Sequence, residues 1–136
     1  MVKVTMKLLI DSSFMIMIFQ RTGFSIDEIL EVAQASEMVT LSICVDELKS
    51  IAYRKKGFKS KLAEKVLESL DRLGIKVLRY CGVESKADMA IIDFARENRK
   101  IIVGTCDHEL VVKLREASIP VVYVGSDGRL IVEGMR

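Results

Sequence analysis

Short apolar segments alternate with longer segments of helical character along the whole chain. Residues 6–10, 101–104 and 120–124 read MKLLI, IIVG and PVVYV, and these runs are almost continuously apolar rather than alternately apolar and polar. Strands of this composition are buried on both faces, and they occur mainly in parallel sheets that helices cover on both sides. The alternation therefore predicts an α/β fold with three layers, α/β/α, around a central and mostly parallel sheet.

The predicted helices have recognisable ends. Ser25 and Glu28 stand three residues apart, as in a capping box that opens a helix. Leu62, Val66 and Leu70 recur at helical spacing, and Gly74 follows where that helix would stop. The whole pattern predicts strands at 6–10, 38–43, 75–80, 101–104, 120–124 and 130–132, and helices at 25–35, 45–55, 59–73, 84–98 and 107–117.

The composition fits one domain over residues 1–136. Half of the residues are hydrophobic, which suffices for a core, and the net charge is only +2. The cysteines Cys44, Cys81 and Cys106 are far apart and form no CxxC pair, which favours a reducing cytoplasm over a disulfide framework or a zinc site. We expect no signal peptide, because polar residues 11–13 interrupt the first apolar run, and no membrane span, because no apolar segment approaches the required ~20 residues.

Four acidic residues follow four predicted strands, and parallel strands bring such positions to one edge. Asp11 directly follows the first strand, Glu47 comes shortly after the second, Asp88 lies near the start of the helix after the third, and Asp107 follows the fourth. Ligands of open α/β sheets bind beyond the carboxyl ends of the strands. Carboxylates held together repel one another unless a cation or protons neutralise them, and carboxylate ligands suit Mg²⁺ or Mn²⁺. The sequence thus predicts an acidic metal site suited to phosphodiester cleavage.

A simpler interpretation stays open for each acid taken singly. Asp11, Asp88 and Asp107 lie near predicted helix starts, where an acidic side chain caps the helix or complements its dipole. Glu47 alone would be an ordinary surface glutamate. Asp11 fits this interpretation least well, because it interrupts the otherwise apolar segment LLIDSSFMIMI, where an unpaired charge would be costly.

With these residues in this order, the sequence resembles the PIN-domain nucleases. The resemblance covers nearly the whole chain and rests on LLIDSS (8–13), VDELKSI (45–51), KADMAIIDFA (86–95), IIVGTCDHEL (101–110) and IPVVYV (119–124). It implies a Rossmann-like sheet and metal-dependent cleavage of RNA by an activated water, without a covalent intermediate. By the same resemblance, one or two Mg²⁺ or Mn²⁺ ions would be held by Asp11, Glu47, Asp88 and Asp107, supported through hydrogen bonds by Ser12 and Thr105.

The sequence departs from the family pattern at two places. Met89 stands where many members carry a second acid, and Cys106 stands where Asn is common. Neither change removes one of the four acids, but both leave a non-catalytic RNA-binding or assembly protein open as an alternative. The last third of the chain resembles the branch that processes small-subunit ribosomal RNA, and toxin ribonucleases of toxin–antitoxin pairs share the same core. These roles imply different protein partners, a pre-ribosome or an antitoxin.

A basic segment with two aromatic residues lies between two predicted helices. Residues 53–61, YRKKGFKSK, carry five positive charges and no acid. Basic side chains bind phosphates and exposed aromatic rings stack on unpaired bases, so we expect RNA contact here. The alternative is a solvated connection with Phe58 packed on the core. The residues expected to bind RNA are Arg54, Lys55, Lys56, Lys59 and Lys61.

The apolar run FMIMIF at residues 14–19 is too long for one face of a helix. Its surplus apolar surface predicts a homodimer. The alternative is a helix that is buried on two sides within one chain.

Overall fold

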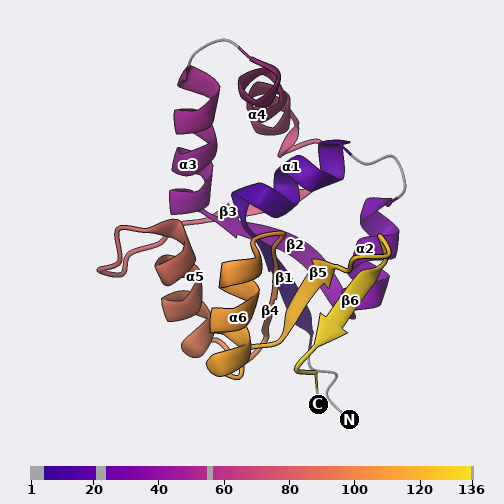
Figure 1. Ribbon diagram of the computed structural model, residues 1–136. Coiled ribbons are helices and arrows are strands. Elements are labelled where there is room, and N and C mark those ends of the chain that lie inside the picture. Colours follow the sequence, from indigo (N-terminus) through magenta and orange to yellow (C-terminus); the bar gives the residue numbers. More distant parts are fainter. Residues whose placement is uncertain (1–4, 21–23, 55–56, 136) are drawn as a thin grey trace.

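Six strands form one sheet in the computed structural model, which describes residues 5–20, 24–54 and 57–135. The strands lie in the order β3-β2-β1-β4-β5-β6, and all neighbours are parallel except β5 and β6. The predicted three-layer fold with a mostly parallel sheet is confirmed (Figure 1). The strands are β1 Met6–Ile10, β2 Ala35–Leu41, β3 Ile75–Leu78, β4 Ile101–Gly104, β5 Val121–Val124 and β6 Leu130–Glu133. The helices are α1 Ser12–Gln20, α2 Ile26–Ala33, α3 Ser42–Tyr53, α4 Phe58–Ser69, α5 Ala87–Arg96 and α6 His108–Glu116.

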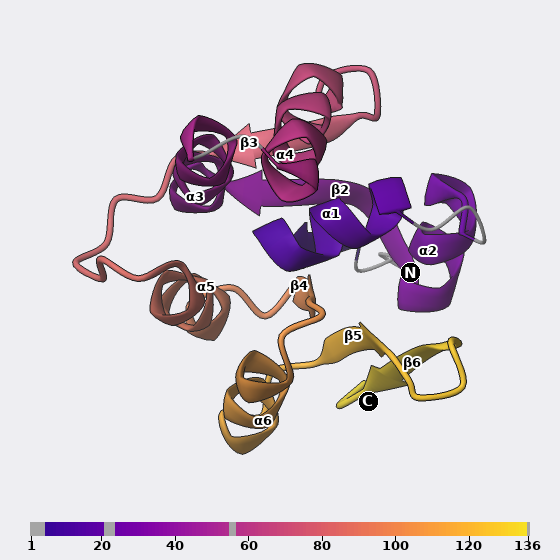
Figure 2. The same ribbon diagram turned by 45° about the horizontal axis from the view of Figure 1, so that its top comes forward.

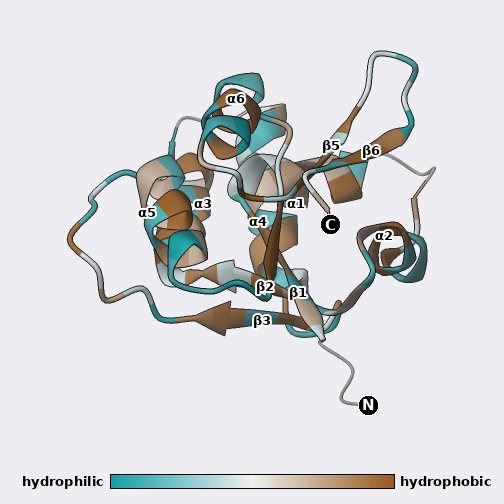
Figure 3. Ribbon diagram, turned by 90° about the horizontal axis from the view of Figure 1, so that it is seen from below, coloured by the Kyte–Doolittle hydropathy of each residue, from teal (hydrophilic) through white to brown (hydrophobic). Residues whose placement is uncertain are grey.

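The most apolar strands occupy the middle of the sheet, where helices cover both faces. Leu8, Leu9 and Ile10 of β1 have no exposed surface, and Leu8 lies between Met38 of β2 and Ile102 of β4 in the parallel ladders. Helices α1, α2 and α4 lie on one side of the sheet, and α5 and α6 lie on the other (Figure 2). Figure 3 shows that hydrophobic and hydrophilic residues alternate around α5, whereas Ile101, Ile102 and Val103 of β4 are all buried. Burial on both faces explains why the central strands lack polar alternation.

Several element boundaries differ from the predicted ones for local reasons. Helix α2 ends at Ala33, because Gln34 adopts the left-handed conformation with φ of 55° and ends the helix, so β2 begins at Ala35 rather than 38. Helix α4 ends at Ser69, and the predicted stop at Gly74 closes the turn that follows, with φ of 74°. These ends illustrate how one left-handed residue redirects the chain.

The segment between β3 and α5 is longer than predicted because Tyr80 bonds outside the sheet. Its backbone N–H donates to Ser42 Oγ at 2.9 Å, so β3 ends at Leu78 rather than 80. Its hydroxyl donates to Asp93 Oδ2 at 2.7 Å and accepts the N–H of Glu84 at 3.1 Å. Helix α5 consequently begins at Ala87 rather than 84.

Helix α1 is buried on more than one side within the chain. Phe14 and Met15 have no exposed surface, and Ile16 and Met17 are also buried. The helix contacts both α3 and α4. The alternative interpretation of the apolar run is therefore the one observed, and the surplus surface that motivated a homodimer is covered by the same chain. A homodimer stays a prediction, checked by the mass of the particle in solution.

The strand order reverses between β1 and β4, which brings two loops together at one edge. Ile10 pairs with Gly104 at the carboxyl ends of these strands, and the N–H of Asp11 donates to the carbonyl of Gly104 at 3.2 Å. The fit at Gly104 is close, because a Cβ there would lie 3.1 Å from Ile10 Cγ2 and 3.3 Å from Phe14 Cδ2, so a larger residue would need these side chains to shift. The tight approach sets Asp11 beside the segment that starts at Thr105. No helix among the described residues is long and apolar enough to cross a bilayer.

Candidate active site

Asp11 is a buried carboxylate held by three hydrogen-bond donors. It is 7% exposed and lies between the end of β1 and the start of α1. Its Oδ1 accepts bonds from Ser13 Oγ at 2.7 Å and from the N–H of Phe14 at 2.9 Å, and its Oδ2 accepts from Thr105 Oγ1 at 2.5 Å. The bond from Phe14 caps α1, as the simpler interpretation expected. The bond from Thr105 reaches across from the loop after β4, so Asp11 also links two loops of the edge.

Burial makes Asp11 a weaker acid than an ordinary aspartate. Loss of water around the carboxylate raises its pKa to about 6, although the bonds from Thr105, Ser13 and Phe14 act in the opposite direction. The negative charge of Glu47 raises the pKa further. A buried carboxylate with this pKa is most stable when protonated or when a cation lies beside it.

Glu47 reaches the same edge from α3. Its Oε1 accepts a hydrogen bond from Ser12, the first residue of α1, while the Glu47 side chain is exposed to solvent. Ser12 itself is buried. Ser12 and Thr105 thus contact two different acids, Glu47 and Asp11, and their role in supporting metal ligands stays a prediction.

Asp88, in the first turn of α5, is paired with a lysine that the sequence interpretation missed. Lys113 of α6 places its Nζ 3.1 Å from Asp88 Oδ2. Partial burial of Asp88 raises its pKa, but the hydrogen bond from Lys113, the N–H of Met89 and the positive charges of Lys113 and Lys86 outweigh this effect and lower the pKa overall. Asp88 is therefore held in its ionised form by a positive charge of the chain itself.

Asp107 is the N-cap of α6, and its Oδ1 accepts the N–H of Glu109 at 3.0 Å. Its own N–H donates to Thr105 Oγ1 at 3.0 Å, so one hydroxyl connects Asp107 to Asp11.

The N-terminal ends of α3, α5 and α6 lie next to one another (Figure 1). They form a cavity of about 520 Å³, whose acidic lining comes from Asp46, Glu47, Asp88 and Asp107.

The carboxylates of the four acids are chemically suited to a divalent cation, but they do not converge on one point in this structure. Carboxylate oxygens are the ligands that Mg²⁺ and Mn²⁺ prefer, and the four acids all lie at this edge. Within residues 5–20, 24–54 and 57–135, however, no three His, Cys, Asp or Glu side chains are placed so that they could hold a metal ion together. Cation binding by these acids would therefore require some of their side chains to move.

The sequence interpretation missed two residues that hold acids of this edge, Ser13 and Lys113. Ser13 donates to Asp11 and accepts the N–H of Cys106 at 3.0 Å, so it joins the two loops. The pair of serines after Asp11 was the available signal, since a hydroxyl next to a buried acid is a natural partner. Lys113 had no such signal, because its distance from Asp88 depends on how α5 and α6 pack.

The basic segment carries two exposed aromatic side chains. Tyr53, at the end of α3, is 89% exposed and Phe58, at the start of α4, is 74% exposed. The alternative in which Phe58 packs on the core is therefore wrong. Arg54, Lys59 and Lys61 are also exposed. Lys55 and Lys56 lie outside the described residues.

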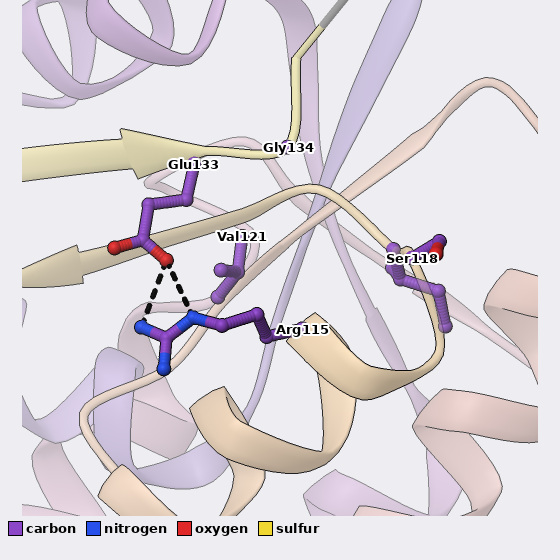
Figure 4. A pocket seen from close by; sticks show the side chains of 6 residues that line it. Arg115, Ser118, Val121, Glu133 and Gly134 are labelled. Carbon is purple, nitrogen blue, oxygen red and sulfur yellow. Dashed lines mark hydrogen bonds and ion pairs between the residues drawn. The ribbon is translucent and has the colours of Figure 1, made fainter.

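A second cavity lies at the opposite edge of the sheet and contains none of the four acids. It measures about 310 Å³ and is lined by Arg115, Ser118, Ile119, Val121, Glu133 and Gly134 (Figure 4). The Arg115 guanidinium holds Glu133 through Nε at 2.9 Å and Nη2 at 2.8 Å, and Tyr123 donates to the same carboxylate at 2.6 Å. These bonds fasten α6 to the β5–β6 hairpin, and we assign this cavity a structural role.

Comparison with known proteins identifies the family to which this fold belongs. The chain is 31% identical to Ribonuclease VapC4 of Methanocaldococcus jannaschii over 131 residues, which is 95% of this chain and 98% of that one. It also shares its fold with a solved structure of the PIN domain endonuclease Utp24, with a TM-score of 0.76 at 17% identity, over 95% of this chain and 92% of the other. A family model described as a PIN like domain matches residues 8–126, and this range contains all four acids. The chain belongs to the PIN-like domain family.

Proposed function

We propose that the chain is a metal-dependent endoribonuclease whose site consists of Asp11, Glu47, Asp88 and Asp107. The observation that carries this proposal is the buried Asp11 carboxylate, which has three donors and lies at the edge where the other three acids are exposed or half-buried. A chain rarely keeps such a group without a task. The similarity to a ribonuclease over nearly the whole length supports cleavage of RNA as this task.

Hydroxyl groups of the chain would fix the orientation of the carboxylates before RNA binds. A divalent cation bound by the four carboxylates would polarise the phosphodiester and favour ionisation of a water. Ser13 and Thr105 orient the carboxylate of Asp11, and Ser12 orients that of Glu47. Partners of this kind reduce the freedom of each ligand and so improve cation affinity.

The tip formed by Tyr53, Arg54, Phe58 and Lys59 would bind single-stranded RNA beside the acids. Two exposed aromatic rings and exposed cations lie together at the junction of α3 and α4. Tyr53 comes six positions after Glu47 in α3, a rise of roughly 9 Å, so one strand of a few nucleotides would span both places. Rings of this kind stack on bases without sequence preference, and cations bind the backbone.

We expect Tyr53→Ala with Phe58→Ala to lower the affinity for single-stranded RNA by roughly tenfold or more, because stacking contributes about 1–3 kcal/mol per base. Arg54→Gln with Lys59→Gln should instead reduce the salt dependence of binding. Fluorescence anisotropy with labelled RNA in EDTA measures both quantities without cleavage. Val83→Ala is the control, since Val83 is 96% exposed but lies in the segment before α5. Unchanged affinity and salt dependence in all variants would remove the tip from the RNA-binding surface.

The proposed activity is tested with end-labelled RNAs incubated with Mn²⁺, Mg²⁺ or EDTA. We expect cuts with either ion and none with EDTA, and Glu47→Gln should lower the rate at least about tenfold because it removes a charged ligand. The control is Asp46→Asn, which changes a neighbouring exposed acid of the same cavity outside the proposed ligand set. Equal cutting by wild type and Glu47→Gln would exclude this site as the source of the activity.

The alternatives from the sequence give different results in the same assays. A non-catalytic RNA-binding protein would bind RNA without cutting it in either ion. Ribosomal RNA processing and a toxin role both predict metal-dependent cutting and differ in the partner, which is a pre-ribosome or an antitoxin. Arrested growth on expression, relieved by a protein encoded beside this one, would favour the toxin role.

A further inference from the structure

Lys113 holds Asp88, the one partly exposed acid of the edge whose two oxygens both have partners among the described residues; the buried Asp11 is engaged at both oxygens too, but only by uncharged donors. Its Nζ contacts Asp88 Oδ2 at 3.1 Å, while Oδ1 of the same carboxylate accepts the N–H of Met89 at 2.9 Å. By contrast, only one oxygen of Glu47 and one of Asp107 accept hydrogen bonds from described residues. A cation approaching Asp88 therefore meets an occupied carboxylate.

The position of Lys113 is fixed by how the two helices pack. Asp88 lies in the first turn of α5, and Lys113 lies in the later part of α6, whose N-cap is Asp107. The ammonium group is also drawn by the negative charges of Glu109 and Asp107. It thus serves as a positive charge among the acids of α5 and α6.

This ion pair is exposed enough to open. The side chains of Lys113 and Asp88 are 44% and 30% exposed, and ion pairs at such exposure contribute little to stability because water solvates both partners after separation. A lysine ammonium on a flexible stem is easily released. The Met89 N–H belongs to the first turn of α5 and has no comparable freedom, so Lys113 is the partner that would leave.

We propose that Lys113 is an exchangeable counter-ion, which holds Asp88 in the absence of metal and competes with the divalent cation for that carboxylate. This inference rests on the proposed metal-dependent function. Competition of this kind sets the cation concentration at which the site fills, without Lys113 being a ligand. Removing the ammonium should therefore tighten cation binding rather than weaken it.

The test is direct binding of Mn²⁺, measured by the loss of the free-ion electron paramagnetic resonance signal. We expect Lys113→Met to bind Mn²⁺ roughly three- to tenfold more tightly than wild type, since a competing half-exposed ion pair is lost. Lys113→Arg keeps the positive charge and should stay close to wild type. In an Asp88→Asn background, Lys113→Met should have much less effect, because the carboxylate under competition is absent.

Lys7→Met is the matched control. Lys7 pairs with Glu37 at 3.3 Å, and their side chains are 45% and 36% exposed. Lys7→Met therefore removes a similar ion pair and the same charge. Lys7 lies near the start of β1, at the opposite edge of the sheet. Thermal melting in EDTA checks that every variant folds.

The outcomes separate this inference from the proposed function. Tighter binding in Lys113→Met alone supports the exchange. If the wild type binds Mn²⁺ and Lys113→Met binds it equally or more weakly, the exchange is overturned and the metal site remains. Equal tightening by Lys7→Met would reduce the effect to net charge. Absence of Mn²⁺ binding in every variant would overturn both the exchange and the metal dependence.

Discussion

Asp11→Asn is expected to abolish RNA cleavage while making the metal-free protein more stable at neutral pH. Changes in the partners of metal ligands already cost about 10- to 100-fold, so loss of the buried ligand itself should lower the rate at least about a hundredfold. Asn keeps the shape of the side chain, and its carbonyl can still accept the bonds from Ser13 and the N–H of Phe14. What disappears is the negative charge.

The gain in stability follows from the raised pKa of Asp11. The unfolded chain releases this proton near the ordinary pKa of 3.8, whereas the folded chain keeps it until about pH 6. The folded state therefore binds more protons between these values, and the free energy of unfolding falls as the pH rises through this window. Above it, the buried charge costs on the order of 3 kcal/mol. Asp11→Asn should recover part of this cost at pH 7.5 and little at pH 4.

Urea unfolding in EDTA at pH 4, 5, 6 and 7.5 measures this difference. The control is Asp27→Asn, because Asp27 is an exposed acid in the first turn of α2 and has the same chemical change. Its stability difference from wild type should stay small at every pH. A variant Asp11→Asn that is less stable than wild type at pH 7.5 would mean that the carboxylate is needed for folding, and the functional explanation of its burial would fail.

The fold was predictable because burial on both faces leaves a simple pattern in the strands. Segments such as LLI in β1 and IIV in β4 have no polar alternation, and a covered parallel sheet accommodates several of them in one short chain. Once the sheet is parallel, the residues after its strands share an edge. That geometry brings Asp11 and Asp107 close together without any detail of side chains.

What the sequence could not provide is set by packing between elements. The ion pair of Lys113 with Asp88 depends on the distance between α5 and α6, and neither residue carries a local signal for the other. The exposure of Phe58 depends on where α4 begins, because the ring precedes the buried face that starts at Ser60. The boundary at Tyr80 depends on bonds to Ser42 and Asp93, which come from other parts of the chain. Local patterns predicted elements, and tertiary contacts decided which side chains meet.

Phe14→Ala is expected to lower the free energy of unfolding by about 3–5 kcal/mol, the largest stability effect among these predictions. Phe14 has no exposed surface, and its ring packs beside Gly104 at the junction of β1 and β4. Removing the ring leaves a cavity under α1. The same change at Phe58, which is 74% exposed, should alter stability by less than about 0.5 kcal/mol. Urea unfolding of the two variants checks the contrast.

The ring of Phe14 should also matter to the site, because α1 begins with the residues that hold two of the acids. Ser12 donates to Glu47, and Ser13 and the N–H of Phe14 donate to Asp11. A cavity beneath the first turn lets these donors shift, so Phe14→Ala should cut RNA more slowly even at temperatures where it is folded. Phe14→Leu fills most of the volume and should recover both stability and cleavage. If Phe14→Ala remains folded and cuts RNA at the wild-type rate, the site does not depend on the packing of α1, and the hydrogen bonds around Asp11 and Glu47 are maintained by the loops alone.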